Sequence, residues 1–404
     1  MNNSAASAYA PSPAPAISAP AISAPPLSIL HSEAATGFGG QETYLYRHLL
    51  AMRARGHRVA LLCQPGAPLG KRAQAAGIEV LELPMGGALR LAAGIVRVRK
   101  LLRQRRFDVV NTTSRRDTLI VACAARLARI GLVVRSRHLM SPVNSLLTYA
   151  MLPHRVLAVS EHVRQLLVRR GMRAERVGVV PPAVAALPWL DAAAEQAWSQ
   201  RCDRRRRARR ELGFGATDLL VGCVAVLRQP KGHAELIEAI TPLCLRHPHL
   251  HLLLVGHGDV ARRRLQAQCQ AHGIQTQVHF LGYRQDACEL MPAFDVFALA
   301  TRREAAGTVL LEAAAAAVPI VATDVGGIPE MLERGGNALL SGVDDIAAMT
   351  QSLRLLVEHP GLRRRMGLAG WRWLRQHPEF TVAGQAEATE RLYHRWQEER
   401  HAGR

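Results

Sequence analysis

The sequence predicts two α/β domains in tandem, each built on a parallel sheet that is covered by helices on both faces. Its 404 residues exceed a typical single hydrophobic core, so two domains are expected. Short apolar runs alternate with longer amphipathic runs, and this rhythm restarts after an arginine-rich segment at 201–215. Strands that are apolar throughout and separated by helices indicate a doubly wound parallel sheet.

The first half contains six apolar runs that predict strands. A glycine-rich turn follows the first run and leads into a predicted helix at 41–56, and a second amphipathic helix is expected at 161–171. The strands are expected at 27–30, 57–63, 77–83, 107–112, 132–138 and 155–160.

The second half repeats this pattern, and its last segment, 380–400, predicts one amphipathic helix. Ligands of such sheets bind at the carboxyl ends of the strands, so two facing sheets place a substrate in the cleft between them. The strands are expected at 218–227, 250–256, 278–283, 296–300 and 319–323.

These patterns divide the chain into five segments. Residues 1–26 carry no charge and consist mostly of Ala, Pro and Ser, which indicates a disordered tail rather than a secretory signal. After this tail we expect an N-terminal domain at 27–188 and a basic linker, in the form of a solvated helix, at 189–214. A C-terminal domain is expected at 215–378, and a last helix at 379–404 is expected to pack back on the N-terminal domain.

The composition argues against several classes of protein. Seven scattered cysteines, with no CxxC pair, argue against a disulfide framework or a zinc site and favour a reducing compartment. No apolar run approaches the roughly 20 residues of a membrane-spanning helix. The net charge of +20 is concentrated in residues 27–185, with 25 Lys/Arg against 8 Asp/Glu, so this half is expected to face an anionic partner.

Two carboxylates, Glu304 and Glu312, lie in a segment rich in small apolar residues. A strand precedes Glu304, and Gly307 or Thr308 is expected to cap a helix that carries Glu312 on its first or second turn. The backbone amides up to Val309 then point out of the helix start and suit a phosphate. Carboxylates accept hydrogen bonds from sugar hydroxyls, so a phosphate site flanked by two of them fits a nucleotide sugar.

Five motifs occur along the chain in a fixed order: GFGGQE at 37–42, VLRQPKGHAELIEAI at 226–240, LLLVGHGD at 252–259, FLGYRQDACELMPAFDVFAL at 280–299, and the pair of glutamates that leads into VPIVATDVGGIPE at 318–330. On these motifs the chain resembles the retaining glycosyltransferases of family 4, which have the GT-B fold of two Rossmann-like domains facing a central cleft. The similarity spans almost the whole chain from residue 27. It implies an acceptor-binding N-terminal domain and a C-terminal domain that binds the nucleotide-sugar donor.

The resemblance also implies roles for single residues. Glu304 would contact the hydroxyls of the donor sugar, and Glu312 the ribose of the nucleotide. Lys231 would neutralise the donor diphosphate, and as a point charge after a strand it is chemically suited to do so. His138 follows a strand and matches a histidine beside the donor sugar, where imidazole could orient the sugar or share the charge of the leaving group.

The sequence departs from the family pattern at the diphosphate. Many members carry an arginine where Val226 stands, and Arg228 is expected to take over that contact. Recognition of the nucleotide base is expected near Tyr283 and Arg284. On the acceptor side, VVPPAVAAL at 179–187 lacks the usual Asn-Gly turn, and Asn111 and Thr113 replace frequent histidines in DVVNTTS.

The glycine-rich loop ATGFGGQE lies between the first strand and its helix. Gly37, Gly39 and Gly40 permit close approach of a ligand and unusual backbone dihedrals. The resemblance places this loop across the donor phosphates and near the acceptor, and an ordinary tight turn is the alternative. The order GxGG, rather than GxGxxG, disfavours a nicotinamide cofactor.

A basic amphipathic helix is expected at 95–107, where six Lys/Arg accompany apolar residues at helical spacing. This pattern favours contact with an anionic membrane surface, and an ordinary surface helix of an arginine-rich chain is an equal alternative. With only 4% aromatic residues, no stacking platform for nucleic acid is expected. The cations expected at the membrane are Arg97, Arg99, Lys100 and Arg103.

The sequence therefore predicts a cytoplasmic, peripheral membrane glycosyltransferase that moves a sugar from a nucleotide-diphosphate sugar to a hydroxyl of a lipid-linked glycan. The resemblance suggests a role in bacterial lipopolysaccharide or exopolysaccharide synthesis and a front-face reaction, with Glu304 as the alternative nucleophile. No metal is expected, because Lys231, Arg228 and the helix start near Gly307 would meet the charge of the leaving group, and the acidic pair in VDD at 343–345 is more consistent with a helix cap. No cofactor is expected, because the nucleotide sugar is a substrate. A nucleotide-sugar epimerase of the same fold and a non-catalytic nucleotide-sugar-binding partner protein are the alternatives.

Overall fold

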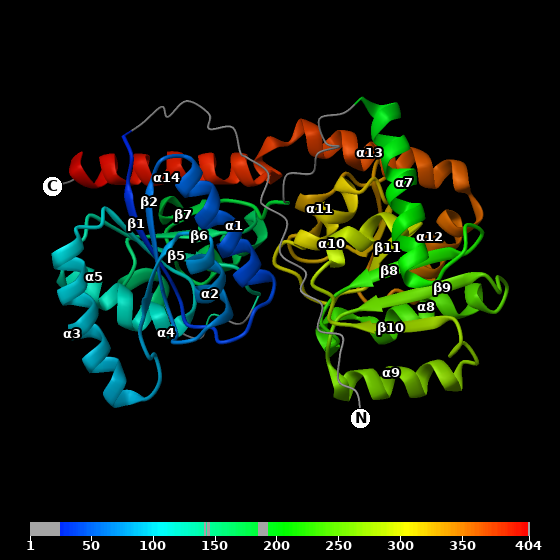
Figure 1. Cartoon of the computed structure of the whole chain (residues 1–404), viewed down its shortest axis with the longest axis horizontal. Helices are drawn as coiled ribbons and strands as arrows, with labels where there is room; N and C mark the ends of the chain where they lie inside the picture. The colour runs from blue at the N-terminus through cyan, green and yellow to red at the C-terminus, as the bar shows by residue number, and fades with distance from the viewer. Residues whose placement is uncertain (1–24, 141–142, 144–145, 185–192, 403–404) are drawn as a thin grey trace.

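The computed structural model describes residues 25–140, 143, 146–184 and 193–402. Nearly all of the expected tail at 1–26 lies outside the described residues, as does the expected boundary at 188. Two lobes lie side by side, each with a sheet at its centre and helices around it (Figure 1).

The N-terminal lobe contains a seven-stranded sheet in the order β3-β2-β1-β4-β5-β6-β7, and each neighbouring pair is parallel. Its strands are β1 (Ser28–Glu33), β2 (Arg58–Cys63), β3 (Glu79–Glu82), β4 (Val109–Thr112), β5 (Leu132–Arg137), β6 (Arg155–Ala158) and β7 (Val177–Val179). Its helices include α1 (Gly40–Ala54), α2 (Pro68–Ala75), α3 (Ala88–Arg105), α4 (Arg115–Asp117), α5 (Cys123–Leu127) and α6 (Glu161–Arg169).

The C-terminal lobe contains a six-stranded parallel sheet in the order β10-β9-β8-β11-β12-β13. Its strands are β8 (Leu219–Val224), β9 (Leu250–Val255), β10 (Val278–Gly282), β11 (Val296–Leu299), β12 (Ile320–Thr323) and β13 (Ala338–Ser341). Its helices are α8 (His233–Cys244), α9 (Asp259–Ala271), α10 (Ala287–Leu290), α11 (Thr308–Ala315), α12 (Ile346–Glu358) and α13 (Pro360–Gln376).

Both sheets confirm the expected fold class of two doubly wound α/β domains. The inner strands are short and almost wholly buried because helices cover both faces, as the continuous apolar runs require, whereas the edge strands β3, β7, β10 and β13 are only partly buried. In each sheet the strand order reverses beside the first strand, between β1 and β4 and between β8 and β11. Crevices form at the carboxyl ends of strands at such points, which places the candidate site there.

The arginine-rich segment is not the solvated linker that the sequence predicts. Its described part forms α7 (Ala194–Leu212), which packs against the C-terminal lobe. Arg201 Nε donates to the carbonyl oxygen of Ala317 at 3.1 Å, and Arg205 pairs with Asp295 at 2.9 Å. Arg209 also pairs with Asp295 and is almost fully buried. Arginines four residues apart share one helical face, so this face is packed while the other remains solvated.

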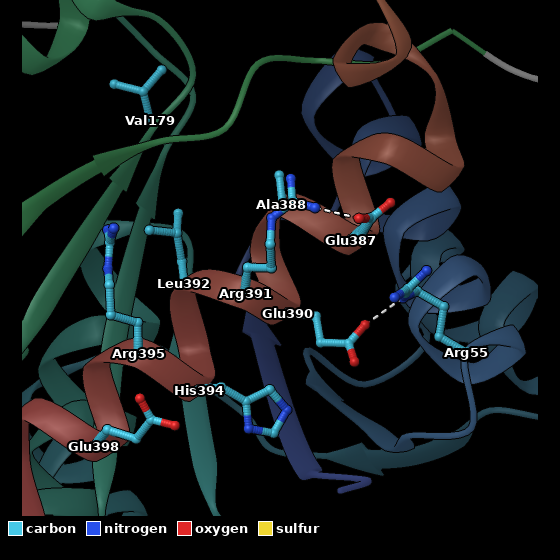
Figure 2. A pocket seen from close by; sticks show the side chains of 10 residues that line it. All are labelled: Arg55, Val179, Glu387, Ala388, Glu390, Arg391, Leu392, His394, Arg395 and Glu398. Carbon is cyan, nitrogen blue, oxygen red and sulfur yellow. Dashed lines mark hydrogen bonds and ion pairs between the residues drawn. The ribbon is translucent and has the colours of Figure 1, made fainter. Parts of the chain in front are cut away.

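The last helix, α14 (Val382–Ala402), lies across the N-terminal lobe and contacts α1 and β5. Glu390 points from α14 toward Arg55, with 2.5 Å between Oε2 and Nε (Figure 2). Arg55 and Glu390 line a pocket of about 560 Å³ on this face. The pocket contains none of the residues expected to bind a donor, and it is lined by Arg55, Val179, Glu387, Ala388, Glu390, Arg391, Leu392, His394, Arg395 and Glu398.

Candidate active site

The loop that carries Glu304 follows β11 and leads into α11, which begins at Thr308 after Gly307. Gly307 has the left-handed backbone (φ 82°) that favours glycine at such a start. Gly326 packs so closely on this loop that a Cβ there would lie 1.9 Å from the carbonyl oxygen of Glu304. The glycines of the DVGG turn therefore fix the backbone that presents Glu304.

Lys231 and Glu304 form an ion pair, with 2.6 Å between Nζ and Oε2. Lys231 ends a short 3₁₀ turn, and the next residue, Gly232, has φ 70°. A Cβ on Gly232 would lie 1.7 Å from the carbonyl oxygen of Ala300, so glycine is required there for the turn to pack on the loop. Thr301 Oγ1 donates to the carbonyl oxygen of Pro230 at 2.7 Å and joins the two segments. Two expected donor residues are thus brought together.

Glu312, on the second turn of α11, pairs with Arg47 of α1 from the other lobe. Arg47 Nη1 lies 3.4 Å from Glu312 Oε1, and the side chains are 23% and 17% exposed. Burial raises the pKa of the neighbouring Cys288 thiol to about 12, and the Glu312 carboxylate adds to this shift. The sequence did not indicate Arg47, because its partner lies 265 residues away.

Further polar contacts join the lobes near this site. Ser160 Oγ donates to the carbonyl oxygen of Ala305 at 2.6 Å. The Glu330 carboxylate accepts from the backbone amides of Glu161 and His162 at the start of α6, at 2.6 and 2.7 Å. A carboxylate is favourable at a helix N-terminus, so the GGIPE turn of one lobe caps a helix of the other.

The glycine-rich loop differs in part from the expectation. Gly37, Gly39 and Gly40 do not adopt the left-handed backbone that glycine permits. A Cβ on Gly37 or Gly40 would meet nothing within 4 Å, which leaves space beside the loop. The Gly39 amide donates to Glu42 Oε2 at 2.7 Å and starts α1.

Glu33 holds this loop from the end of β1 and was not singled out in the sequence. Its carboxylate accepts from the Ala35 amide at 3.0 Å and from Gln41 Nε2 at 2.6 Å. The side chain is fully buried, and burial raises its pKa to about 7, with the Asp117 carboxylate adding to the shift. The sequence signal for Glu33 would have been a carboxyl residue close behind the apolar run of the first strand.

His138 follows β5 and packs on α1. Its ring lies 4.4 Å from that of Tyr44, edge to face, in a group that also contains His31 and His48. Burial lowers the pKa of His138 to about 3, and His48 adds to the shift, so the ring is neutral at neutral pH. Within the described residues, the His138 ring contacts Tyr44 of its own lobe.

The other expected donor residues lie after β8, after β10 and at the start of α11. Arg228 is exposed three residues before Lys231, and Val226 is exposed beside it. Tyr283 is 57% exposed and lies edge to face with His257. Arg284 pairs with Asp286 at 2.6 Å. Thr308 and Val309 form the first turn of α11, as expected.

The basic helix predicted at 95–107 is part of α3. Arg97, Lys100 and Arg103 are exposed, whereas Arg99 is half-buried. Two apolar side chains, Leu91 and Val96, are exposed on the same helix. None of the described helices is long and apolar enough to cross a membrane.

The acidic pair at 343–345 does not form a metal cluster. Asp345 Oδ1 accepts from the Ala348 amide at 2.9 Å and caps α12, which is the predicted arrangement. Asp344 pairs with Arg302 at 2.8 Å. Across the described ranges, no group of three His, Cys, Asp or Glu side chains is placed to hold a metal ion.

Two family models match this chain. The model described as Glycosyltransferase Family 4 matches residues 38–186, and the model described as Glycosyl transferases group 1 matches residues 204–373. The first covers the lobe with Arg47, and the second covers the lobe with Lys231, Glu304 and Glu312.

Relatives and solved structures agree with these two matches. D-inositol 3-phosphate glycosyltransferase of Corynebacterium jeikeium is 33% identical over 196 residues, so the match spans about half the length of that relative, 46% of each chain. Phosphatidyl-myo-inositol mannosyltransferase of Mycobacterium tuberculosis is 29% identical over 368 residues, 86% of this chain and 91% of that protein. The structure of Anabaena Alr3699/HepE in complex with UDP-glucose has a TM-score of 0.77 at 22% identity, over 91% of this chain and 99% of that one. The chain therefore has the GT-B fold, and its two lobes are similar to glycosyltransferases of family 4 and of group 1.

Proposed function

We propose that the chain is a retaining glycosyltransferase that moves a sugar from a nucleotide-diphosphate sugar to a hydroxyl of an acceptor. The observation that carries this proposal is the pairing of Lys231 with Glu304 beside the start of α11, the helix that also carries Glu312. The cation Lys231 and the start of α11 suit a diphosphate, because both attract negative charge. The carboxylates Glu304 and Glu312 suit the hydroxyls of a sugar and a ribose, because carboxylates accept hydrogen bonds.

The donor exchanges partners with the protein when it binds. The diphosphate takes the ammonium group of Lys231, which frees Glu304 Oε2 for a hydroxyl of the sugar. Arg228 and the backbone amides from Gly307 to Val309 also interact with the negative charge of the diphosphate. Together they stabilise the nucleotide as it leaves, because preorganised donors at a site of developing negative charge lower the barrier. The proposal assigns this task to protein groups, without a metal ion or a cofactor.

Glu304 suits the role of a hydrogen-bond acceptor better than that of a nucleophile. Its Oε2 is held by Lys231, and its Oε1 accepts from the Ala305 amide at 3.1 Å. With the donor bound, Oε1 keeps this amide and Oε2 accepts from a sugar hydroxyl in place of Lys231, and a carboxylate that accepts a hydrogen bond on each oxygen is a weakened nucleophile. This favours a front-face reaction, in which the acceptor hydroxyl approaches the side from which the phosphate leaves and its proton passes to that phosphate.

The acceptor is proposed to be anionic and lipid-linked. The N-terminal half carries most of the positive charge, and the matched relatives are named for inositol phosphate and phosphatidyl-inositol acceptors. The exposed face of α3, with Arg97, Lys100, Arg103 and Val96, would meet an anionic membrane on its cytoplasmic side. Synthesis of a cell-surface glycan, such as lipopolysaccharide or exopolysaccharide, is the proposed setting.

Nucleotide release tests the activity. The protein is incubated with UDP-glucose, GDP-mannose or ADP-glucose, with and without vesicles that contain phosphatidylinositol, and NMR follows the anomeric proton of the product. We expect release of one nucleotide, faster with an acceptor, and an α-linked product from an α-linked donor. Release of no nucleotide from a folded protein would contradict the transferase, and an inverted product would contradict retention.

A further inference from the structure

We propose that Arg47 is a positioning residue of the donor site: it holds Glu312 in the donor-free chain and is displaced when the ribose of the nucleotide binds. This inference rests on the proposed function, because it takes Glu312 as the acceptor for the ribose hydroxyls. It adds a residue of the N-terminal lobe to a site otherwise built from the C-terminal lobe.

The geometry places Arg47 beside Glu312, one of the expected donor residues. Helices α1 and α11 lie on the facing sides of the two lobes (Figure 1). Arg47 is on the second turn of α1, and Nη1 reaches within 3.4 Å of Glu312 Oε1. Cys288 of α10 interacts with both side chains, so part of the ion pair is shielded from water.

The two carboxylates of the site are each matched by one cation. Glu304 is paired with Lys231 of its own lobe, and Glu312 with Arg47 of the other. Two neighbouring ribose hydroxyls require both oxygens of a carboxylate, and Arg47 occupies one of them. Binding of the ribose to Glu312 therefore competes with Arg47, just as binding of the diphosphate competes with Glu304 for Lys231.

Loss of Arg47 is expected to act locally, because other contacts still join the lobes. Ser160 bonds to the Ala305 carbonyl, and Glu330 caps the start of α6. Arg47 contributes to none of these contacts. Its removal is therefore expected to free Glu312 without separating the lobes.

Donor affinity tests the displacement. The dissociation constants of UDP-glucose, GDP-mannose and ADP-glucose are measured by calorimetry for wild type, Arg47→Ala and Arg47→Met, the last of which keeps an aliphatic stem. Arg53→Ala is the control, since Arg53 lies on the same helix and bonds to the Ala76 carbonyl. We expect both Arg47 variants to bind the preferred donor about two- to fivefold more tightly, the range for a partly exposed ion pair, and the control to match wild type.

A 2′-deoxy form of the preferred donor identifies the ribose as the competitor. Because it has one hydroxyl fewer to bond to Glu312, its affinity should rise less on loss of Arg47 than the affinity of the ribose form does. Equal affinity of wild type and Arg47→Ala would overturn the displacement. Weaker binding by both Arg47 variants would overturn it as well, because Arg47 would then be a contact of the donor.

A double-mutant cycle tests the ion pair without any donor. Melting temperatures are measured for wild type, Arg47→Ala, Glu312→Ala and the double variant, and non-additive losses are expected. Additive losses would overturn the proposal. If no nucleotide sugar binds wild type or either Arg47 variant, the proposed function fails and the displacement falls with it. If wild type and Arg47→Ala bind a donor equally, this inference alone fails.

Discussion

Lys231 Nζ lies 2.6 Å from Glu304 Oε2, and this ion pair joins the turn after β8 to the loop after β11. The two side chains are 18% and 15% exposed, so the pair is partly shielded from water. An ammonium group held by one carboxylate remains available to a diphosphate, which carries more negative charge. We therefore expect a bound donor to draw Lys231 away from Glu304.

Replacing Lys231 by methionine is expected to weaken binding of the donor. The variant keeps the aliphatic stem but loses the charge, and Glu304 then repels the diphosphate. A hydrogen bond to a charged group contributes about 1.5–3 kcal/mol, so affinity should fall roughly 10- to 100-fold. Calorimetric titration with the preferred nucleotide sugar measures this, and an affinity equal to that of wild type would remove Lys231 from the site.

Replacing Gly326 by alanine is expected to displace Glu304. The added Cβ would lie 1.9 Å from the Glu304 carbonyl oxygen, and Gly326 also has a left-handed backbone (φ 63°). We expect the free energy of unfolding to fall by about 2–4 kcal/mol. Urea unfolding, with donor titration of the folded protein, measures both effects.

Gly335→Ala is the matched control for that variant. Gly335 has φ 77°, but a Cβ there would meet nothing within 4 Å. It should lose about 1–2 kcal/mol from the backbone alone and keep donor binding. Equal losses in the two variants would show that packing against Glu304 is not what requires glycine at 326.

Glu33 is expected to make stability fall as the pH rises. Its pKa is raised from 4.5 to about 7 by burial, so between these values the folded chain holds a proton that the unfolded chain has released. The stabilisation is full below pH 4.5 and is lost as the pH rises to about 7. Glu33→Gln cannot ionise, so it should gain on the order of 2 kcal/mol of stability relative to wild type between pH 5 and pH 8.

Urea unfolding of both proteins at pH 5, 6, 7 and 8 measures this difference. Because both chains share the other titrating groups, including the buried histidines, the difference reports Glu33 together with its interaction with the Asp117 carboxyl. A difference that does not change with pH would mean that Glu33 is ionised throughout, and that its contacts with Ala35 and Gln41 stabilise the carboxylate fully.

The alternation of apolar and amphipathic runs was sufficient to predict both sheets, because each buried parallel strand is a continuous apolar run. Two edge strands were not predicted. β7 has the sequence VGV, which a glycine interrupts, and β13 has the sequence ALLS between glycines, so neither strand is a long continuous apolar run.

Contacts between distant segments were beyond prediction from local patterns. The even spacing of Arg201, Arg205 and Arg209 was visible, yet their partners are backbone carbonyls and Asp295, which the packing of α7 brings close. Arg47 likewise lies on an ordinary amphipathic helix, and its role depends on how the two lobes meet. Glu304 and Lys231 were accessible because each follows a predicted strand at the same edge of one sheet.

The central claim is that the cleft binds a nucleotide sugar through Glu312 and its neighbours. The most direct test is thermal unfolding of wild type and Glu312→Ala with UDP-, GDP- and ADP-sugars. We expect the sugars of one nucleotide to raise the melting temperature of wild type, which identifies the base that the protein binds. In Glu312→Ala most of this rise should be lost. No rise with any donor in a folded protein would contradict the claim and favour a protein that does not use nucleotide sugars.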